Sequence, residues 1–310
     1  MANKDICENA CAVLDSLHRL PKGKDVLCEK IAGGLTNTMY LIKIDNESRY
    51  VFRVNGFGTE KLVDRIEEKR VLEQAALARI CPKVIYIDEK VMLQEFCPGR
   101  TLGLSSIDDP KIHELIAKKL ATFHLLSVEN PARSEPWFTK TLKSYLLELN
   151  DPKMSDLGNE LLRKIESMDF QLTLCHNDLR LNNVIYEDDK LVFIDFEYAA
   201  MNFPEYDIAH YFWQHEGAQT ASDFRTLTSK DRKLFLSEYL QAYYNVEPSE
   251  KLINEILQRI RIFEAANHFL WSVWSLIQHR FGRSDDHFCY IKNSEARFAK
   301  YRECLEKATI

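Results

Sequence analysis

CHNDLRLNNVIYEDDKLVFIDFEYAAMN, the stretch from Cys175 to Asn202, places an acid, an amide and a second acid in one hairpin-like segment. Asp178 comes two residues after His176, Asn183 comes five after Asp178, and Asp195 follows an apolar, strand-like run. An enzyme that transfers a phosphoryl group needs one carboxylate to accept the proton of the attacking hydroxyl, and an amide with another carboxylate to hold magnesium on the nucleotide phosphates. The order predicts Asp178 as the base and Asn183 and Asp195 as ligands of Mg2+, which prefers oxygen.

A simpler explanation of the two strings has to be compared with this one. Asn and Asp are ordinary turn residues, so short D-x(4)-N and I-D-F strings also arise by chance between strands. Here the strings stand in order, about a strand pair apart, and each lies beside an apolar run. That combination favours the catalytic interpretation.

The sequence motifs around the two acids differ from those of protein kinases. Those enzymes carry H-R-D and D-F-G at these places, whereas this chain has H-N-D and D-F-E. The pattern resembles the choline and ethanolamine kinase family through the H-N-D and D-F-E strings, Tyr198, Asn202 and Asp207-Ile208. The NGFGTEKLVDR string of residues 55–65 resembles the bacterial branch of the choline kinases. The resemblance implies ATP and Mg2+ as cofactors. It also implies an α+β, two-lobed, protein-kinase-like fold, with a small N-terminal lobe on an antiparallel sheet and a large, mainly helical C-terminal lobe.

Length and composition limit the class of protein. The chain has 310 residues, 45% hydrophobic and 28% charged, which is typical of a globular protein with room for two lobes. A net charge of −6 offers no basic surface for nucleic acid. No apolar run approaches the roughly 20 residues that cross a bilayer, and the opening MANKDICENACAVL lacks a signal region. We expect a cytoplasmic protein without membrane insertion, whose eight cysteines are free thiols.

The first part of the chain predicts an edge helix at residues 5–20 and then, from Val26 to Leu41, a strand, a glycine-rich turn and a second strand. The turn could cover nucleotide phosphates, because glycine lets the backbone approach a ligand closely and polar residues supply donors. Its candidate residues are Gly33, Gly34, Thr36, Asn37 and Thr38. A plain Gly-Gly hairpin turn also explains them, and both interpretations stay open.

The strand Tyr50–Val54 carries one cation, Arg53, among apolar neighbours. In kinases the third strand presents a lysine to the nucleotide phosphates, and an arginine can serve the same purpose with a bidentate fork. An exposed strand position is the alternative for Arg53. The next residues predict a helix from about Thr59 to Ile80 with Thr59 as its N-cap. Glu68 on this helix could pair with Arg53 and fix it, and Glu67 remains an alternative.

Two further strands are predicted at Lys83–Asp88 and Val91–Phe96, before a turn at Cys97-Pro98-Gly99. We place a domain boundary here, with residues 1–97 as the nucleotide-binding lobe and residues 98–310 as the catalytic and substrate-binding lobe. In a kinase-like fold the segment before the boundary is the hinge, so the backbone of Gln94, Glu95 and Phe96 would contact the adenine.

Past the boundary the sequence becomes mainly helical. Apolar residues at spacings of three and four predict helices at residues 108–126, 137–149, 157–167, 230–244, 248–280 and 288–307. His124 lies on the apolar face of the first and is expected to pack rather than to catalyse. By the family resemblance, Asp207 is a buried carboxylate that braces the catalytic loop, and such a group needs partners like the loop amides.

The helix at residues 248–280 places Glu264, His268, Trp271 and Trp274 on one side, because they are four, three and three residues apart. Such a stripe is commonly part of a core. Two indoles near a carboxylate also suit a cage for a quaternary ammonium, since each ring face attracts a cation by roughly 0.5–2 kcal/mol. The family resemblance implies this second role for Trp271 and Trp274.

The resemblance implies other substrate-binding residues too, with departures from the family pattern. The implied aromatic residues of the pocket are Tyr198, Phe288 and Tyr290. Gln214 and Asn293 stand where we expect an acid and a tyrosine, so Glu216 or Glu264 would have to supply the acid. These departures leave the choice between choline and ethanolamine open.

The sequence thus predicts ATP-dependent phosphorylation of the hydroxyl of choline, or of ethanolamine, with a small amino alcohol as the partner and phosphocholine and ADP as products. An aminoglycoside-type or other small-molecule phosphotransferase is the first alternative, although it would need an open, acidic acceptor pocket in place of a tryptophan stripe. An inactive kinase-like binding scaffold is the second, and the intact metal-binding residues argue against it.

Overall fold

The structure is a computed structural model that describes residues 2–20, 22–31, 37–45, 48–56, 63–126, 135–281 and 288–308. The chain forms two compact units. The first contains residues 1–100 and 192–198, and the second contains residues 101–191 and 199–310. The short segment 192–198 is tied to the first unit because Phe193 N donates to Ile80 O at 2.8 Å and Asn37 Nδ2 donates to Glu197 at 2.9 Å.

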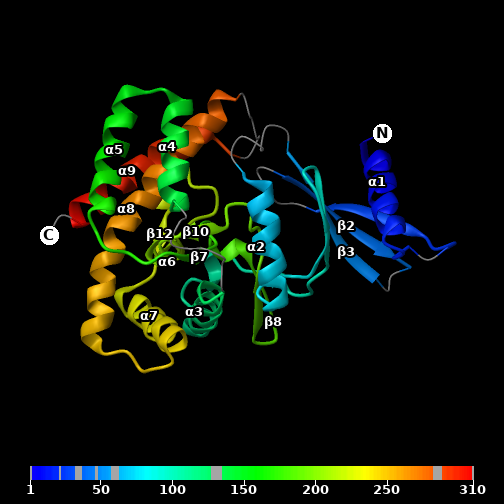
Figure 1. Ribbon diagram of the computed structural model, residues 1–310, viewed down its shortest axis with the longest axis horizontal. Coiled ribbons are helices and arrows are strands. Elements are labelled where there is room, and N and C mark those ends of the chain that lie inside the picture. The colour runs from blue at the N-terminus through cyan, green and yellow to red at the C-terminus, as the bar shows by residue number, and fades with distance from the viewer. Residues whose placement is uncertain are drawn as a thin grey trace. The chain divides into compact units, whose positions relative to one another are not determined.

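The first unit is built on a five-stranded antiparallel sheet, shown in blue and cyan in Figure 1. The strand order is β1-β2-β3-β5-β4. The strands are β1 (Val26–Ile31), β2 (Asn37–Ile44), β3 (Ser48–Asn55), β4 (Val84–Ile87) and β5 (Val91–Glu95). Helix α1 (Ala2–Ser16) packs on the sheet, because its Ala10 and Leu14 share a core with Ile42, Phe52 and Leu93.

Cys7 on α1 is bonded to Cys28 on β1, with their Cα atoms 5.8 Å apart. The prediction of eight free thiols is therefore wrong for this pair. Packing of the helix against the strand brings together two cysteines that are 21 residues apart in the sequence. The cysteines without a disulfide are Cys11, Cys81, Cys97, Cys175, Cys289 and Cys304.

Helix α2 (Arg65–Leu77) is shorter than the predicted helix at both ends. Its N-cap is Asp64, whose Oδ1 accepts from Glu67 N at 3.1 Å, while the predicted cap Thr59 lies outside the described residues. The helix ends before Ile80 because Arg79 adopts a positive φ of 57°, which no helix can continue. Its buried face includes Glu68.

The second unit is mainly helical, so with the antiparallel sheet of the first it confirms the predicted α+β class. Its helices are α3 (Pro110–His124), α4 (Trp137–Leu149), α5 (Pro152–Glu166), α6 (Pro204–Phe212), α7 (Ser229–Tyr244), α8 (Glu250–Arg280) and α9 (Tyr290–Ala308). The remaining strands are short: β6 (Arg100–Thr101), β7 (Thr173–Cys175), β8 (Val184–Glu187), β9 (Lys190–Phe193), β10 (Ala200–Asn202), β11 (Trp213–Gln214) and β12 (Arg225–Thr226). They pair as β6-β8-β9, β7-β10 and β11-β12. Single 3-10 turns lie at Leu104–Ser106, Leu181–Asn183 and Ala221–Asp223.

Side-chain caps set where several of these helices begin. Asp151 Oδ1 accepts from Met154 N at 2.9 Å and Pro152 occupies the first turn, so α5 starts there rather than at the predicted Leu157. The predicted helix at residues 137–149 is confirmed as α4. Thr228 and Ser249 cap α7 and α8 in the same way.

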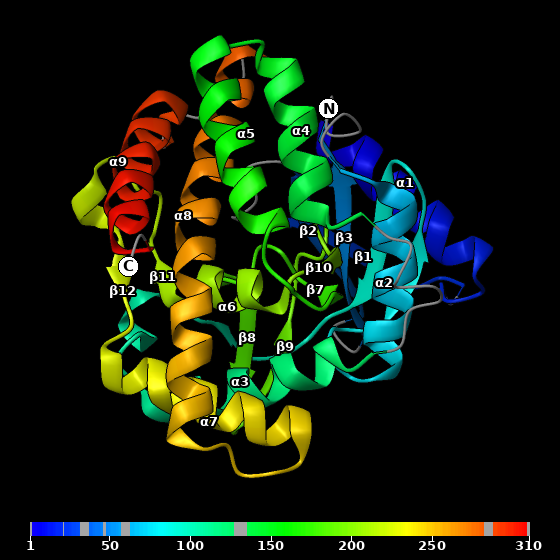
Figure 2. The same ribbon diagram turned by 60° about the vertical axis from the view of Figure 1, so that its left-hand side comes forward.

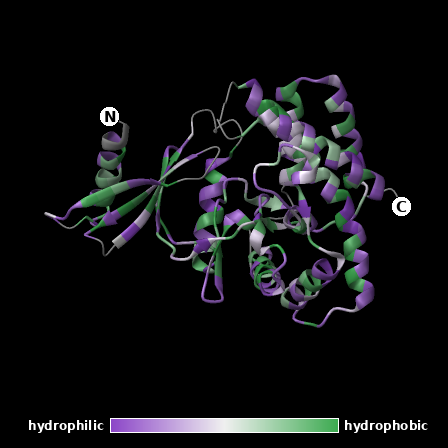
Figure 3. Ribbon diagram, turned by 180° about the vertical axis from the view of Figure 1, so that it is seen from behind, coloured by the Kyte–Doolittle hydropathy of each residue, from purple (hydrophilic) through white to green (hydrophobic). Residues whose placement is uncertain are grey.

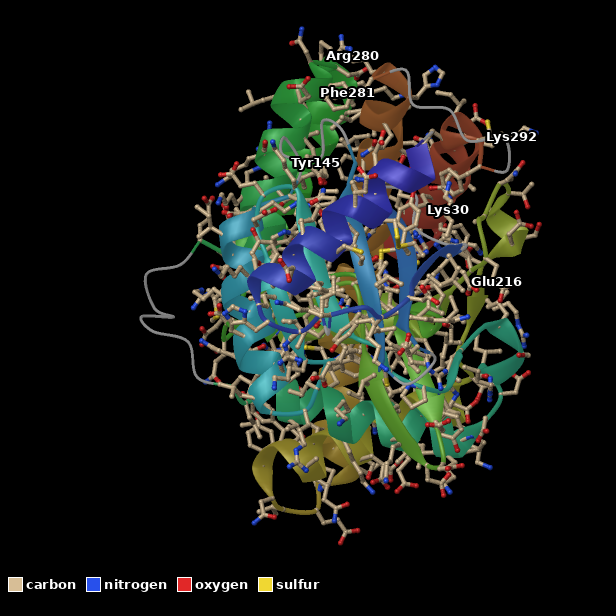
Figure 4. The ribbon with its side chains drawn as sticks, turned by 90° about the vertical axis from the view of Figure 1, so that its right-hand side faces the viewer. Lys30, Tyr145, Glu216, Arg280, Phe281 and Lys292 are labelled. Carbon is tan, nitrogen blue, oxygen red and sulfur yellow. A yellow bond between two sulfur atoms is a disulfide. The ribbon has the colours of Figure 1, made fainter. Side chains whose placement is uncertain are left out.

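Helix α8 extends along the second unit and packs against α4, α5, α6, α7 and α9 (Figure 2). Hydrophobic and hydrophilic residues alternate along these helices in Figure 3, as expected for helices with one buried face. At the end of α8, Arg280 (labelled in Figure 4) donates to the carbonyls of Glu148 and Leu149 at 2.8 and 2.7 Å. Both residues belong to the last turn of α4. None of the helices in the described residues is long and apolar enough to span a membrane.

Candidate active site

The loop after β7 carries Asp178, and a buried carboxylate fixes its path. Asp207 on α6 is fully buried and accepts from the backbone N–H groups of His176 and Asn177, both at 2.6 Å. Asn177 itself adopts a positive φ of 66°, which these bonds hold in place. The predicted bracing role of Asp207 is confirmed. His124 also donates to Asp207, at 3.1 Å, and it packs in the core as predicted.

Asp178 lies in this loop with only 8% of its surface exposed. Its Oδ1 is 3.1 Å from His210 Nε2 and 3.3 Å from Arg180 Nε, and its Oδ2 accepts from Asn183 Nδ2 at 3.1 Å. Burial alone would raise the pKa of Asp178, but Arg180 and then His210 outweigh it and hold the pKa well below its usual range. The carboxylate is therefore ionised at neutral pH and can accept a hydroxyl proton. Asp178 and Asn183, predicted to act together, are in direct contact.

The sequence-based prediction did not include His210, whose Nε2 lies 3.1 Å from Asp178 Oδ1. Its Nδ1 donates to Asn267 Oδ1 on α8, and the amide orientation follows from Asn267 Nδ2, which donates to Tyr206 O at 3.0 Å. His210 Nε2 is thereby turned toward the Asp178 carboxylate. The spacing of His210 three residues after Asp207 on one helix is a signal that could have revealed it.

A row of neighbouring aromatic rings begins at His210, which lies beside Asp178. The ring centroids of His210 and Trp271 are 5.8 Å apart, those of Trp271 and Trp274 are 5.6 Å apart, and those of Trp274 and Tyr290 are 5.8 Å apart. Phe288 follows at 5.0 Å from Tyr290. We call these five residues the aromatic row. It brings the four predicted aromatic residues of the second unit together and joins them to the predicted base.

The two acids predicted to contact the substrate have other partners. Glu264 is buried and bound by Arg232 at 2.7 Å and by Trp213 Nε1 at 2.6 Å, so its charge is already matched. Glu216, labelled in Figure 4, is exposed and accepts from the backbone N–H of Leu104 at 2.8 Å. These contacts give both acids a structural role.

Gln214 and Asn293, the two departures from the family pattern, are buried structural residues. Gln214 Oε1 accepts from Leu181 N at 2.9 Å, and Gln214 Nε2 donates to Tyr211 O at 2.7 Å. Gln214 thus holds the 3-10 turn that contains Asn183. Asn293 accepts from Ser275 Oγ at 2.9 Å and donates to Ala218 O at 2.8 Å.

In the first unit, Arg53 is buried and paired with Glu68, as predicted. Arg53 Nη1 donates to Glu68 Oε1 at 2.6 Å, and Arg65 Nη1 donates to the other oxygen at 2.7 Å. Burial opposes ionisation of Glu68, but Arg53 and Arg65 overcome it and hold its pKa below the usual value. The alternative partner Glu67 pairs with Arg70 instead. Arg53 is not at an exposed strand position, since only 2% of its surface is accessible.

Arg53 also has donors left for a ligand. Its Nε and Nη2 are buried and have no hydrogen-bond partner among the residues that the structure describes. A buried guanidinium with two such donors suits a phosphate oxygen. Nearby, Asn37 Nδ2 donates to Glu197 at 2.9 Å, and Thr38 pairs with Val54 across the sheet. Gly33, Gly34 and Thr36 lie outside the described residues.

The predicted hinge is the end of β5, where Gln94 and Glu95 are strand residues and Phe96 follows. Glu95 N donates to Lys83 O at 2.9 Å and Phe96 N donates to Arg49 O at 3.1 Å. These two N–H groups are committed to the sheet, so an adenine ring would have to use other backbone groups of the segment. The Arg49 guanidinium covers the Phe96 ring at 5.2 Å.

Asp195 and Tyr198 belong to the segment that completes the first unit. Asp195 adopts a positive φ of 65°, which is uncommon outside glycine and frequent at functional sites. Its charge contributes, after those of Glu68 and Glu197, to raising the pKa of Arg53 against the effect of burial. Tyr198 is buried. The convergence of Asp195 with Asp178 and Asn183 stays a prediction.

Comparisons with known proteins agree with this geometry. Residues 28–302 match the model of a family described as choline/ethanolamine kinase. The chain is 27% identical to a probable ethanolamine kinase A of Dictyostelium discoideum, over 98% of this chain and 93% of that protein. It is also 27% identical to ethanolamine kinase 2 of Mus musculus, over 96% and 81% of the two chains.

Solved structures show the same fold. An ethanolamine kinase of Plasmodium vivax superposes with a TM-score of 0.81 at 23% identity, covering 94% of this chain and 86% of that one. LicA in complex with AMP superposes with a TM-score of 0.72 at 25% identity, covering 99% of both chains. The fold and the acid–amide loop define a kinase-like phosphotransferase. The chain belongs to the choline/ethanolamine kinase family.

Proposed function

We propose that the protein transfers the γ-phosphoryl group of ATP to the primary hydroxyl of choline, with ethanolamine as the second candidate, and releases phosphocholine and ADP. The observation that carries this proposal is the contact of Asp178 with His210, from which the aromatic row continues. A hydroxyl beside Asp178 and an ammonium group against the rings match the two ends of an amino alcohol. Because the reaction uses ATP, the proposal places the protein in the cytoplasm.

In this mechanism Asp178 orients the hydroxyl and accepts its proton as the phosphoryl group is transferred. Its depressed pKa makes it a weak base, so its contribution is mainly orientation until the oxygen becomes acidic during transfer. Asn183 donates to Asp178 Oδ2 at 3.1 Å and keeps the carboxylate in one position, which lowers the entropic cost of reaching the reactive geometry.

Asn183 and Asp195 would hold Mg2+, and the available donor atoms fit that ion. Asn183 Nδ2 is committed to the backbone and side-chain oxygens of Asp178, at 2.8 and 3.1 Å, so its oxygen is the atom left for a metal. Asp195 would supply a carboxylate, and oxygen ligands of this kind suit magnesium. When bound, magnesium neutralises charge on the phosphates. Arg53 would position the phosphates through its two remaining donors.

Choline is favoured over ethanolamine by the surroundings of the aromatic row. Its methylated ammonium needs only ring faces, at roughly 0.5–2 kcal/mol each. The protonated amine of ethanolamine carries N–H donors that need acceptors, and Glu264, an acid predicted to supply one, is already matched by Arg232. The curated relatives reported above are ethanolamine kinases by name, so the two substrates have to be compared directly.

A coupled assay of ADP release with choline, ethanolamine and an aminoglycoside as separate substrates tests the proposal. We expect turnover with choline, a lower kcat/KM with ethanolamine and none with the aminoglycoside. Turnover with the aminoglycoside alone would identify the first alternative, an antibiotic-type phosphotransferase. No ADP release with any alcohol, in protein that binds ATP, would identify a binding scaffold.

A further inference from the structure

Arg180 lies beside the proposed base, and the proposed function gives it no role. It immediately precedes the 3-10 turn Leu181–Asn183, and its Nε lies 3.3 Å from Asp178 Oδ1. Burial raises the pKa of Asp178, and the charge of Arg180 is the largest of those that lower it. Because a guanidinium stays protonated at neutral pH, a permanent positive charge lies next to the carboxylate that accepts the hydroxyl proton.

The guanidinium of Arg180 has donors that the described residues do not use. Its Nε is buried without a hydrogen-bond partner among them, so its contact with Asp178 is one of charge. The side chain as a whole is 20% exposed. Nη1 and Nη2 make no hydrogen bond within the described part of the chain either, but they are not enclosed, since Nε alone of the three nitrogens is cut off from solvent. Accessible donors on a planar guanidinium suit phosphate oxygens.

A second guanidinium adds positive charge to the same surroundings. Arg297 on α9 is 7% exposed, and its Nη2 lies 2.6 Å from His215 Nε2. Burial and then the charge of Arg180 lower the pKa of Arg297 to about 9, against the effect of Asp178. Arg297 therefore stays charged at neutral pH. Within the group of Arg180, Arg297 and Asp178, positive charge exceeds negative charge, and Asp207 is already engaged by the backbone of the loop.

The proposed transfer creates negative charge beside Asp178. The hydroxyl oxygen gives its proton to Asp178 and forms a bond to the γ-phosphorus, while the bond from that phosphorus to the bridging oxygen breaks and leaves its electron pair on ADP. A neutral hydroxyl thereby becomes a phosphate ester. The carboxylate of Asp178 alone would repel the oxygens of the phosphoryl group, because like charges repel strongly where water is excluded. A cation next to the carboxylate offsets this repulsion.

We propose that Arg180 is a further catalytic residue, which binds the phosphoryl group as it passes to the alcohol and then holds the phosphate of the product. Its terminal nitrogens donate to the phosphoryl oxygens, and Arg297 adds positive charge from the interior. The site thus has an anionic end at Arg180 and a cationic end at the aromatic row. The inference rests on the proposed function, because Asp178 marks the position of the hydroxyl only if it is the base.

Binding of choline and of phosphocholine can be compared by calorimetry, in the absence of nucleotide and magnesium. The two ligands differ only in the phosphate, so their difference reports on the anionic end. We expect both to bind the unchanged protein. Arg180→Gln should raise the dissociation constant of phosphocholine by about tenfold or more and change that of choline by less than about twofold. Arg180→Lys keeps the charge without the planar fork, so its affinity for phosphocholine should lie between the two.

Arg163→Gln is the matched control, since Arg163 is an exposed arginine of the same unit, on α5. It should bind both ligands as the unchanged protein does. An ADP-release assay at about pH 8, where Asp178 is ionised with or without its neighbour, then measures catalysis. There kcat should fall by about 10²–10³ in Arg180→Gln, with little change in the KM for choline and none in Arg163→Gln.

An arginine that only orients Asp178 would give a different result. Arg180→Gln would then lower kcat and leave the affinity for phosphocholine as it is, and this outcome overturns the inference. It is also overturned if millimolar phosphocholine does not bind the unchanged protein while choline does. That comparison needs no variant, so it holds even if Arg180→Gln fails to fold.

Failure of the proposed function can be told apart from failure of this inference. If the unchanged protein releases no ADP with choline or with ethanolamine, the proposed function is wrong and the inference falls with it. If it turns over choline but Arg180→Gln binds phosphocholine normally, only the role of Arg180 is wrong. If ethanolamine is the better substrate, ethanolamine and phosphoethanolamine replace the two ligands in the same comparison.

Discussion

Glu68→Gln should destabilise the first unit, and the buried charges around Glu68 give the size of the effect. The side chains of Arg53, Arg65, Glu68 and Glu197 are 3%, 9%, 0% and 3% exposed. Two positive and two negative charges lie within this group, and the charge of Asp195 also acts on Arg53. The substitution removes the charge of the carboxylate to which both arginines donate.

Removing one partner of a buried ion pair costs about 3–5 kcal/mol. Glutamine can still accept one hydrogen bond, so we expect about 3 kcal/mol. The adjacent substitution Glu67→Gln is the control. Glu67 pairs with Arg70 at the surface, where the two side chains are 26% and 36% exposed, and such a pair contributes about 0–1 kcal/mol.

Hydrogen exchange of backbone amides in β3 and β5, at Phe52 and Leu93 for example, measures the stability of this unit directly. A loss of about 3 kcal/mol corresponds to roughly a hundredfold faster exchange in Glu68→Gln, against less than about tenfold in Glu67→Gln. The KM for ATP should also rise more in Glu68→Gln, because Arg53 loses the carboxylate that fixes it. Equal exchange rates in the two variants would refute the reasoning.

The ion pair of Glu68 with Arg53 predicts that the stability of the first unit depends on pH. The folded-state pKa of Glu68 lies below its ordinary value of 4.5, so its stabilising effect is complete above that pH. The effect is lost as the pH falls through the folded-state pKa. The difference in stability between the unchanged protein and Glu68→Gln should therefore shrink in acid.

Three further predictions concern the second unit. Asp178→Asn should lower kcat by about 10²–10⁴ while leaving the KM for ATP nearly unchanged, in an ADP-release assay with choline; near-normal turnover would rule Asp178 out as the base. Trp271→Leu should raise the KM for choline far more than that for ATP, whereas Trp137→Leu, outside the aromatic row, should affect neither; equal rises in both constants would assign Trp271 to the core. Arg180 is the largest influence that lowers the pKa of Asp178. Asp178 should therefore stay ionised between about pH 8 and pH 6, so its protonation should cause no fall in kcat/KM over that range. Arg180→Gln should raise that pKa and shift the acid side of the pH profile upward, and an unshifted profile would contradict the assignment.

Local sequence patterns accounted for most of the elements and for some contacts. The strands of the first unit and the helices of the second other than α6 followed from apolar periodicity, which reflects burial on one face. Helix α6 was not predicted. The predicted starts of helices were less accurate where a side-chain cap sets the first residue, as Asp64 does for α2 and Asp151 for α5. The family resemblance implied that Asp207 braces the loop, and its contacts with the loop amides meet the need of a buried carboxylate for donors.

The sequence by itself determined the order of Asp178, Asn183 and Asp195, and with it the kind of chemistry, because the catalytic strings are local and their spacing is fixed along the chain. Only the tertiary structure decided which groups meet across long separations. It paired Asp178 with His210, neutralised Glu264 with Arg232, and joined Cys7 to Cys28. The physical reason is that periodicity specifies the face on which a side chain lies, whereas its charge partner depends on how separate elements pack.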